Sequence, residues 1–147
     1  ARKVLESAEE YKTGFHLPID VQVASSPDSE STYIPVEDVT GDMKIFDIGP
    51  HSINSYEEIL KHSKTVIWNG PMGLYEKEAY RDGTEKLAKY LVNSCDSQTI
   101  LGGGDTLGAL KKFGIPQESY THVSTGGGAM LEFLEGKNLP GIEILKK

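Results

Sequence analysis

Three consecutive glycines at positions 102–104 are the first residues whose types and spacing suggest chemistry. They follow a strand-like apolar run at residues 99–101 and precede a helical pattern at residues 107–113. A strand, a glycine turn and a helix in this order place unpaired N–H groups at a positively polarised helix end, which binds phosphate. Glycines also let the backbone approach an anion closely, because they have no Cβ. The segment predicts a phosphate or nucleotide site, with a purely structural turn as the alternative.

The residue after these glycines, Asp105, does not suit direct phosphate contact, because two anions repel each other. It fits either as the N-cap of the following helix or as an oxygen ligand of a phosphate-bound Mg²⁺. The loop matches neither of two common phosphate motifs. Leu107 stands where G-x-G-x-x-G requires its third glycine, and Ala109 stands where the P-loop requires lysine. A dinucleotide domain of the dehydrogenase type is therefore disfavoured.

The composition is that of one ordinary globular domain, with 147 residues, 37% hydrophobic and 25% charged. A net charge of −7 argues against nucleic acids and anionic membranes as partners. It also implies that backbone dipoles, a metal ion or basic groups from elsewhere must balance a bound nucleotide. Cys95 is the single cysteine, so an intrachain disulfide is excluded and a cytoplasmic location is expected. No apolar run approaches transmembrane length.

Strand-like and helical patterns alternate along the chain. We expect strands at residues 15–24, 44–50, 65–68, 98–101 and 121–124. We expect helices from the start of the chain to Gly14, after Ser52 as N-cap, and at residues 79–92, 107–113 and 129–134. Residues 25–41 are polar and predict a surface excursion, for which a small hairpin is one form. Pro140 and Gly141 should break the tail. Because the first helical stripe has no cap and residue 1 is alanine, we expect the chain to belong to a longer polypeptide.

This alternation predicts an α/β fold with an open, mainly parallel sheet between helices, in a Rossmann-like three-layer arrangement. In such sheets, ligands bind beyond the carboxyl ends of the strands. Four unusual turns follow strands in this chain, at residues 47–50, 69–76, 102–106 and 125–128. We expect them to converge on one edge and form a single ligand crevice.

Six segments together resemble the phosphoglycerate kinase family. They are Leu-Pro-Ile-Asp at 17–20, Asp-Ile-Gly-Pro at 47–50, Val-Ile-Trp-Asn-Gly-Pro-Met-Gly at 66–73, Gly-Gly-Gly-Asp-Thr at 102–106, His-Val-Ser-Thr-Gly-Gly-Gly-Ala at 122–129 and Leu-Glu-Gly-Lys-Asn-Leu-Pro-Gly at 134–141. They follow the family's order and spacing over nearly the whole chain. The Trp-Asn-Gly-Pro motif combined with two Gly-Gly-Gly turns is highly specific.

The resemblance implies a two-domain glycolytic kinase that transfers a phosphoryl group between 1,3-bisphosphoglycerate and ADP, reversibly. Its C-terminal domain would hold Mg-ATP or Mg-ADP, and its N-terminal domain would bind 3-phosphoglycerate. Residues 1–147 would be an incomplete C-terminal domain, without the substrate domain and without the family's Gly-Gly-Ala-Lys segment. We therefore expect an active, monomeric whole protein, whereas these residues alone should show no turnover. A non-catalytic nucleotide-binding or scaffold fragment is the alternative.

The resemblance also assigns roles to individual residues. The nucleotide pocket would be lined by Phe46, Asn69, Gly70, Pro71, Gly73, Leu74 and Tyr75, with Glu76 accepting from the ribose hydroxyls. The phosphates would face Gly103, Gly104, Asp105 and Thr106, with Asp105 holding Mg²⁺. The catalytic N–H groups would come from Gly104, Gly126, Gly127 and Gly128. Simpler interpretations stay open: Glu76 as a solvated acid, Trp68 as a core residue and Thr106 as a helix cap.

Overall fold

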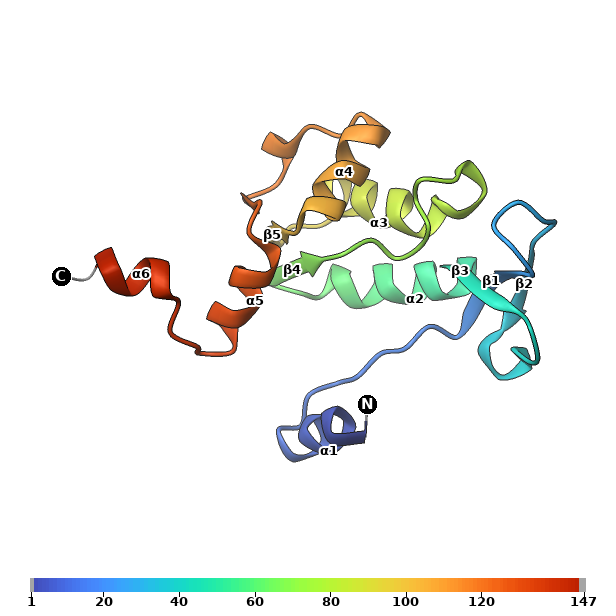
Figure 1. The fold of residues 1–147 in the computed structure, drawn as a ribbon, viewed down its shortest axis with the longest axis horizontal. Helices are drawn as coiled ribbons and strands as arrows, with labels where there is room; N and C mark the ends of the chain where they lie inside the picture. Colours follow the sequence, from blue (N-terminus) through green and yellow to red (C-terminus); the bar gives the residue numbers. More distant parts are fainter. Residues whose placement is uncertain (1, 146–147) are drawn as a thin grey trace.

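The computed structural model describes residues 2–145, which form an α/β fold (Figure 1). The strands are β1 (Asp20–Ala24), β2 (Thr32–Pro35), β3 (Lys44–Ile48), β4 (Thr65–Asn69), β5 (Gln98–Gly102) and β6 (His122–Ser124). The α-helices are α1 (Arg2–Glu10), α2 (Pro50–Lys61), α3 (Asp82–Asn93), α4 (Gly104–Phe113), α5 (Gly127–Leu134) and α6 (Pro140–Leu145). Short 3₁₀ turns lie at Val36–Asp38, Glu78–Tyr80 and Gln117–Ser119.

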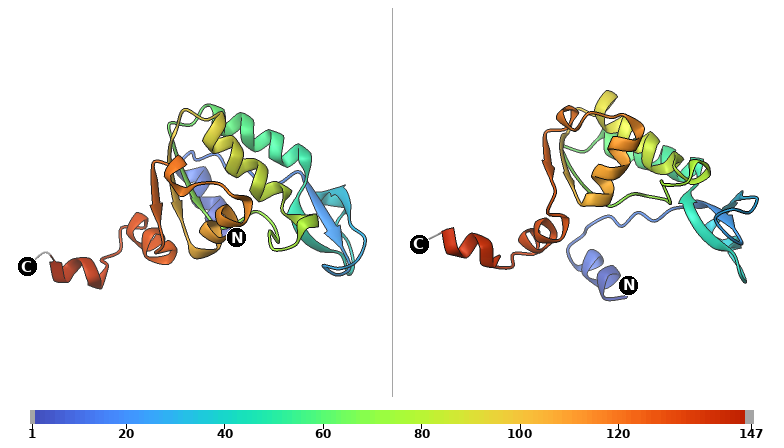
Figure 2. Two further views of the ribbon diagram at one scale, coloured as in Figure 1. Left: turned by 90° about the horizontal axis from the view of Figure 1, so that it is seen from above. Right: turned by 45° about the horizontal axis from the view of Figure 1, so that its top comes forward.

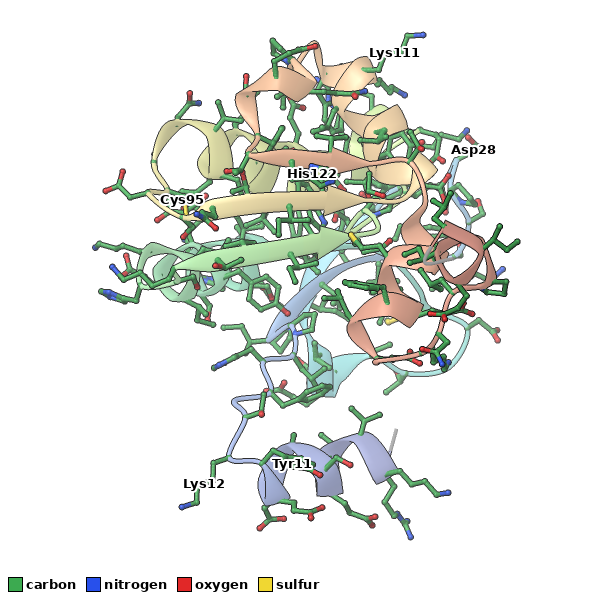
Figure 3. All side chains as sticks on the ribbon, turned by 90° about the vertical axis from the view of Figure 1, so that its left-hand side faces the viewer. Tyr11, Lys12, Asp28, Cys95, Lys111 and His122 are labelled. Carbon is green, nitrogen blue, oxygen red and sulfur yellow. The ribbon has the colours of Figure 1, made fainter. Side chains whose placement is uncertain are left out.

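The strands of the described residues form two three-stranded sheets. One contains β4, β5 and β6 in that order, all parallel, as their aligned arrowheads show in Figure 3. In the other, β1 lies between β2 and β3 and is antiparallel to both. The predicted α/β fold with a parallel sheet and flanking helices is confirmed. The expectation that β1 and β3 join the parallel sheet is wrong, because the connections at 25–31 and 36–43 are too short for crossover helices.

One helix, α3, connects the two sheets through their cores. In the first core, Leu91 of α3 belongs to the same cluster as Trp68 of β4, Leu101 of β5 and Leu110 of α4. In the second core, Leu87 of α3 packs with residues of β3 and α2. Helices α3 and α4 therefore cover one face of the parallel sheet, and α2 lies beside α3 (Figure 1). Apolar burial at two successive turns along one face of α3 fixes the antiparallel sheet relative to the parallel one.

The opposite face of the parallel sheet is less covered within the described residues. Ile67 and His122 are exposed there, and a hollow of about 420 Å³ lies between this face and α5. Helix α1 lies apart from both sheets and buries none of its residues, and α6 extends away from the rest (Figures 1 and 2). None of the described helices is long and apolar enough to cross a membrane.

Several local boundaries differ from the predictions. The first strand begins at Asp20, after the proline at position 18, and α1 ends before Lys12, which has a φ of 53° in place of the expected Gly14. The helix expected at 79–92 is divided into the turn Glu78–Tyr80 and α3. Pro140 begins α6 instead of breaking the tail, because proline is tolerated in the first helical turn, where its missing N–H has no partner anyway.

Ser52 is not the N-cap of α2; that position belongs to Gly49. The Ser52 side chain lies in the first turn of α2, is only 1% exposed, and accepts N–H groups from Ile19 at 2.9 Å and Asp20 at 3.0 Å. The Asp20 carboxylate in turn accepts the N–H groups of His51 and Ser52 at 3.0 and 2.7 Å. Although burial opposes it, hydrogen bonds from Ser52 and His51 hold the pKa of Asp20 below its usual value. A strand carboxylate therefore caps α2.

Replacing Ser52 by alanine should lower the free energy of unfolding by about 2 kcal/mol, because the buried Asp20 N–H and the partly buried Ile19 N–H lose their acceptor. Urea denaturation measures this loss. Ser55→Ala, on an exposed position of the same helix, should change stability by no more than about 0.5 kcal/mol. Equal effects of the two substitutions would contradict a special role for the Ser52 hydroxyl.

Candidate functional site

The turns after β4, β5 and β6 lie together at one edge of the parallel sheet. Asn69 is paired with Gly102, and Gly102 with Ser124, so the three strands end level with one another (Figure 3). The fourth turn, at 47–50, ends a strand of the antiparallel sheet, so the expectation that all four share one sheet edge is wrong for it. The strand that leads into it, β3, is still linked to the turn at 69–76, because the Leu74 N–H donates to the Phe46 carbonyl at 2.8 Å.

The backbones of the β5 and β6 turns are in direct contact. A Cβ on Gly127 would lie 2.6 Å from Gly103 Cα and 2.8 Å from Gly103 N, so no side chain fits there. Gly103 has a φ of 96°, a conformation that residues with a side chain rarely adopt. Its N–H donates to the Ser124 carbonyl at 3.3 Å. These two glycines are therefore required by the geometry of the turns themselves.

Two side chains join the three strand ends. The Asn69 amide donates from Nδ2 to the Gly127 carbonyl at 3.1 Å. The Thr106 hydroxyl, which is fully buried, accepts the Gly70 N–H at 2.8 Å and donates to the Gly102 carbonyl at 2.9 Å. The hydroxyl of Thr106 is therefore occupied within the fold, and the N-cap of α4 is Gly103 instead.

The residues that remain at the surface of this edge belong to the starts of two helices. Gly104 and Asp105 are exposed in the first turn of α4, and Gly128 is exposed in the first turn of α5, with Gly126 just before it. Both helices begin within the glycine runs, earlier than the predicted residues 107 and 129. The first N–H groups of a helix have no acceptor inside it and carry partial positive charge. The edge therefore presents two anion-attracting helix ends.

Asp105 is not the N-cap that one interpretation expected, and within the described residues it forms no salt bridge. Among those residues no group of three or more His, Cys, Asp or Glu could hold a metal ion unaided. A single exposed carboxylate is nevertheless compatible with Mg²⁺ that arrives with a phosphate, since Mg²⁺ commonly combines one or two carboxylates with phosphate and water. The donor set fits a phosphate-bound Mg²⁺.

The β4 turn continues into a loop that lies against α4. The rings of Tyr75 and Phe113 form a T-shaped pair with their centroids 6.4 Å apart, and the Tyr75 hydroxyl lies beside Gly108. The Lys112 ammonium donates to the Glu76 carbonyl at 2.6 Å, whereas the Glu76 side chain is exposed. The rest of the predicted pocket, Gly70, Pro71, Gly73 and Leu74, is half-buried in the same loop, and Phe46 stacks on Tyr80 at 4.9 Å.

Trp68 precedes this loop and is a core residue, 6% exposed, within the cluster under α3 and α4. Its indole Nε1–H donates to the Gly70 carbonyl at 2.6 Å, so the same side chain also braces the start of the loop. Of the two interpretations of Trp68, the structure therefore favours the core residue over an adenine neighbour.

Sequence reasoning missed two buried polar residues beneath the loop. Asp47 accepts the N–H groups of Gly83 and Ile48, each at 2.8 Å. Thr84 accepts the N–H groups of Met72 and Gly73 at 3.0 and 3.4 Å. The sequence signal that could have suggested them is the pair of glycines at 73 and 83, because a Cβ on either would collide with the Asp47 side chain.

Comparison with known proteins identifies the family. The sequence profile described as "Phosphoglycerate kinase" matches residues 1–137. The chain belongs to the phosphoglycerate kinase family. It is 44% identical to the phosphoglycerate kinase of Pelotomaculum thermopropionicum, over 99% of this chain and 37% of that protein. It is 46% identical to that of Borrelia turicatae, over 100% of this chain and 38% of that protein.

Solved structures of the same family match the fold. The phosphoglycerate kinase structure from Coxiella burnetii has a TM-score of 0.88 and 42% identity, covering 98% of this chain and 37% of that one. The structure from Pyrococcus horikoshii has a TM-score of 0.83 and 32% identity, covering 99% of this chain and 36% of that one. The chain thus spans slightly more than a third of the length of these phosphoglycerate kinases.

Gly127→Ala should destabilise the protein by about 2 kcal/mol or more, because the added methyl group meets the Gly103 backbone. Gly128→Ala is the matched control: its Cβ would meet nothing within 4 Å. In the first turn of α5 it should leave stability unchanged or raise it by up to about 1 kcal/mol. Thermal or urea unfolding of both variants checks the contact, and a Gly127→Ala variant as stable as Gly128→Ala would refute it.

Asp47 should make stability depend on pH. Burial raises its pKa from 3.8 to about 6, although the Gly83 and Ile48 N–H groups oppose this. Between pH 3.8 and about pH 6, the Asp47 carboxyl keeps its proton in the folded chain but has lost it in the unfolded chain. The free energy of unfolding therefore falls as pH rises through this window. The loss should be on the order of 3 kcal/mol, and it is complete above the folded pKa.

Asp47→Asn cannot titrate, so the stability difference between it and the parent protein should change across the same pH window. Urea denaturation on both sides of the window measures this difference. Asp42→Asn, at an exposed position, controls for the removal of a carboxylate. A difference between Asp47→Asn and the parent that is constant with pH would show that Asp47 does not titrate there.

Proposed function

We propose that the whole protein carrying these residues is a phosphoglycerate kinase. It transfers a phosphoryl group from 1,3-bisphosphoglycerate to ADP and, in reverse, from ATP to 3-phosphoglycerate. Family membership supports this reaction, and so does the arrangement of the strand ends. The observation that carries most weight is that α4 and α5 begin side by side at one sheet edge, with the Gly103 and Gly127 backbones in contact.

The nucleotide would bind along this edge. The loop after β4 and the neighbouring Phe46 would receive the base and ribose, with the exposed Glu76 carboxylate accepting from the ribose hydroxyls. This part of the pocket would consist of Phe46, Asn69, Gly70, Pro71, Gly73, Leu74, Tyr75 and Glu76. The phosphates would lie over the start of α4, at Gly103, Gly104, Asp105 and the backbone of Thr106. The Thr106 hydroxyl would take no part, because its hydrogen bonds are made inside the fold.

The chemistry asks the protein for positioning and charge stabilisation more than for covalent steps. N–H groups of Gly104, Gly127 and Gly128 would donate to the oxygens of the phosphoryl group in transfer. The Gly126 N–H, which donates to the Ser124 hydroxyl at 3.3 Å in this structure, would join them only by exchanging that partner. Fixed donors at two helix ends need no reorganisation as charge develops. A bound Mg²⁺, held by Asp105, would neutralise phosphate charge.

The partners of the whole protein follow from the same proposal. ATP or ADP with Mg²⁺ would bind here, and 3-phosphoglycerate would bind to an N-terminal domain outside these residues. The chain spans only 37% of the relative from Pelotomaculum thermopropionicum, which leaves room for such a domain. We also propose a cytoplasmic monomer without nucleic-acid or membrane partners, supported by the net charge of −7 and the single cysteine.

The role of Asp105 is tested by calorimetric titration of ADP into the whole protein, with Mg²⁺ and then with a chelator. Mg²⁺ should tighten binding, and Asp105→Asn should lose about tenfold of that gain, or about 1.4 kcal/mol. Asp96→Asn, an exposed carboxylate just before the opposite end of β5, should behave as the parent protein does.

Two other results would point elsewhere. If Asp105→Asn binds Mg-ADP as tightly as the parent protein, Asp105 only stabilises the start of α4. If the whole protein binds Mg-ADP but does not form ATP from 1,3-bisphosphoglycerate, the non-catalytic nucleotide-binding alternative replaces the kinase.

A further inference from the structure

The loop at residues 70–76 is attached to its neighbours along its whole length. Toward α4 it is held at its start by the buried Thr106 hydroxyl and at its end, at the surface, by the Tyr75 ring and the Lys112 ammonium. Toward β3 and α3 it is held from below by two buried polar side chains, those of Asp47 and Thr84. Neither of these two residues belongs to the nucleotide pocket proposed above.

Thr84 acts directly on the loop backbone. Its side chain is completely buried in the first turn of α3, and its Oγ1 accepts the N–H groups of Met72 and Gly73. The next N–H group, that of Leu74, donates to the Phe46 carbonyl at 2.8 Å. Three successive N–H groups of the loop are therefore paired with α3 and β3. Their hydrogen bonds are thus made within the fold although the segment has no regular secondary structure.

Asp47 acts on the loop from β3 and through α3. Its Oδ2 accepts the Gly83 N–H, so the carboxylate fixes the helix residue next to Thr84. A Cβ on Gly73 would lie only 2.3 Å from Asp47 Oδ1, so the loop backbone packs directly against the carboxylate. Asp47 thus fixes how closely the loop approaches β3, while Thr84 provides acceptors for the N–H groups of the loop.

We propose that Thr84 and Asp47 are positioning residues that hold the 70–76 loop in the conformation that binds nucleotide. This inference rests on the proposed function. An unanchored loop would have to be ordered by the ligand, and ordering backbone costs free energy that is taken from binding. Loss of either anchor should therefore weaken nucleotide binding more than it affects the other substrate.

The test uses the whole protein and the nearly isosteric change Thr84→Val. The dissociation constant and KM for Mg-ADP should rise about tenfold, while the KM for 1,3-bisphosphoglycerate stays within about twofold. Thr84→Ser keeps the hydroxyl and should restore nucleotide affinity. The matched control is Thr99→Val, because Thr99 is also buried and its hydroxyl accepts the Thr121 N–H at 3.1 Å near the opposite end of β5.

Thr99→Val should lower stability without changing the KM for Mg-ADP. If Thr84→Val does not fold, Asp47→Asn supplies the same test, with a rise in the KM for Mg-ADP alone. Unchanged nucleotide affinity in the folded anchor variants would overturn the inference. So would a Thr84→Val effect that Thr84→Ser does not reverse, or one that Thr99→Val reproduces. A parent protein that does not bind Mg-ADP would instead reject the proposed function.

Discussion

The contact between the backbones of Gly103 and Gly127 is the constraint on which the site depends. Adjacent parallel strands lie about 4.8 Å apart, so the turns that leave them can touch only where neither carries a side chain. This contact lets α4 and α5 begin side by side, with two positively polarised ends close together. Such an arrangement is electrostatically unfavourable until a negative group lies between the ends. The exposed Asp105 carboxylate offsets it in part, and a polyphosphate would offset it further.

Buried side chains then make the irregular turns rigid. Thr106 and Asn69 pair with backbone groups of the turns at the sheet edge, and Thr84 does the same beneath the β4 loop. Asp47 supports the loop indirectly, by accepting the N–H of Gly83 beside Thr84. Their hydrogen bonds replace those that the backbone makes with other backbone groups in regular helices and sheets. The hydrogen bond from the indole of Trp68 to the Gly70 carbonyl adds a link to the apolar core. The glycines thus supply the shape of the turns, and polar side chains keep that shape.

Local patterns in the sequence were enough to locate the turns, because a strand, glycines and a helix are adjacent along the chain. The separate antiparallel sheet was missed, although the short connections at 25–31 and 36–43 could have indicated it. The early starts of α4 and α5 were missed because glycine disfavours helix interiors, a penalty that matters less in a first turn. Asp47 and Thr84 were missed because their partners lie 36 and 12 residues away, and such pairing leaves no periodic signal.

The charge of the site explains what these residues can and cannot contribute to the proposed reaction. Each helix N-terminus is equivalent to about +0.5 charge, so α4 and α5 together offset only a small part of the negative charge of a nucleoside diphosphate and a phosphoryl group. Lys112, which lies near the site, already donates to the Glu76 carbonyl, and Asp105 and Glu76 add negative charge. The described residues therefore suit the placing of donors. Under the proposed function, most of the positive charge would come from Mg²⁺ and from basic groups outside them.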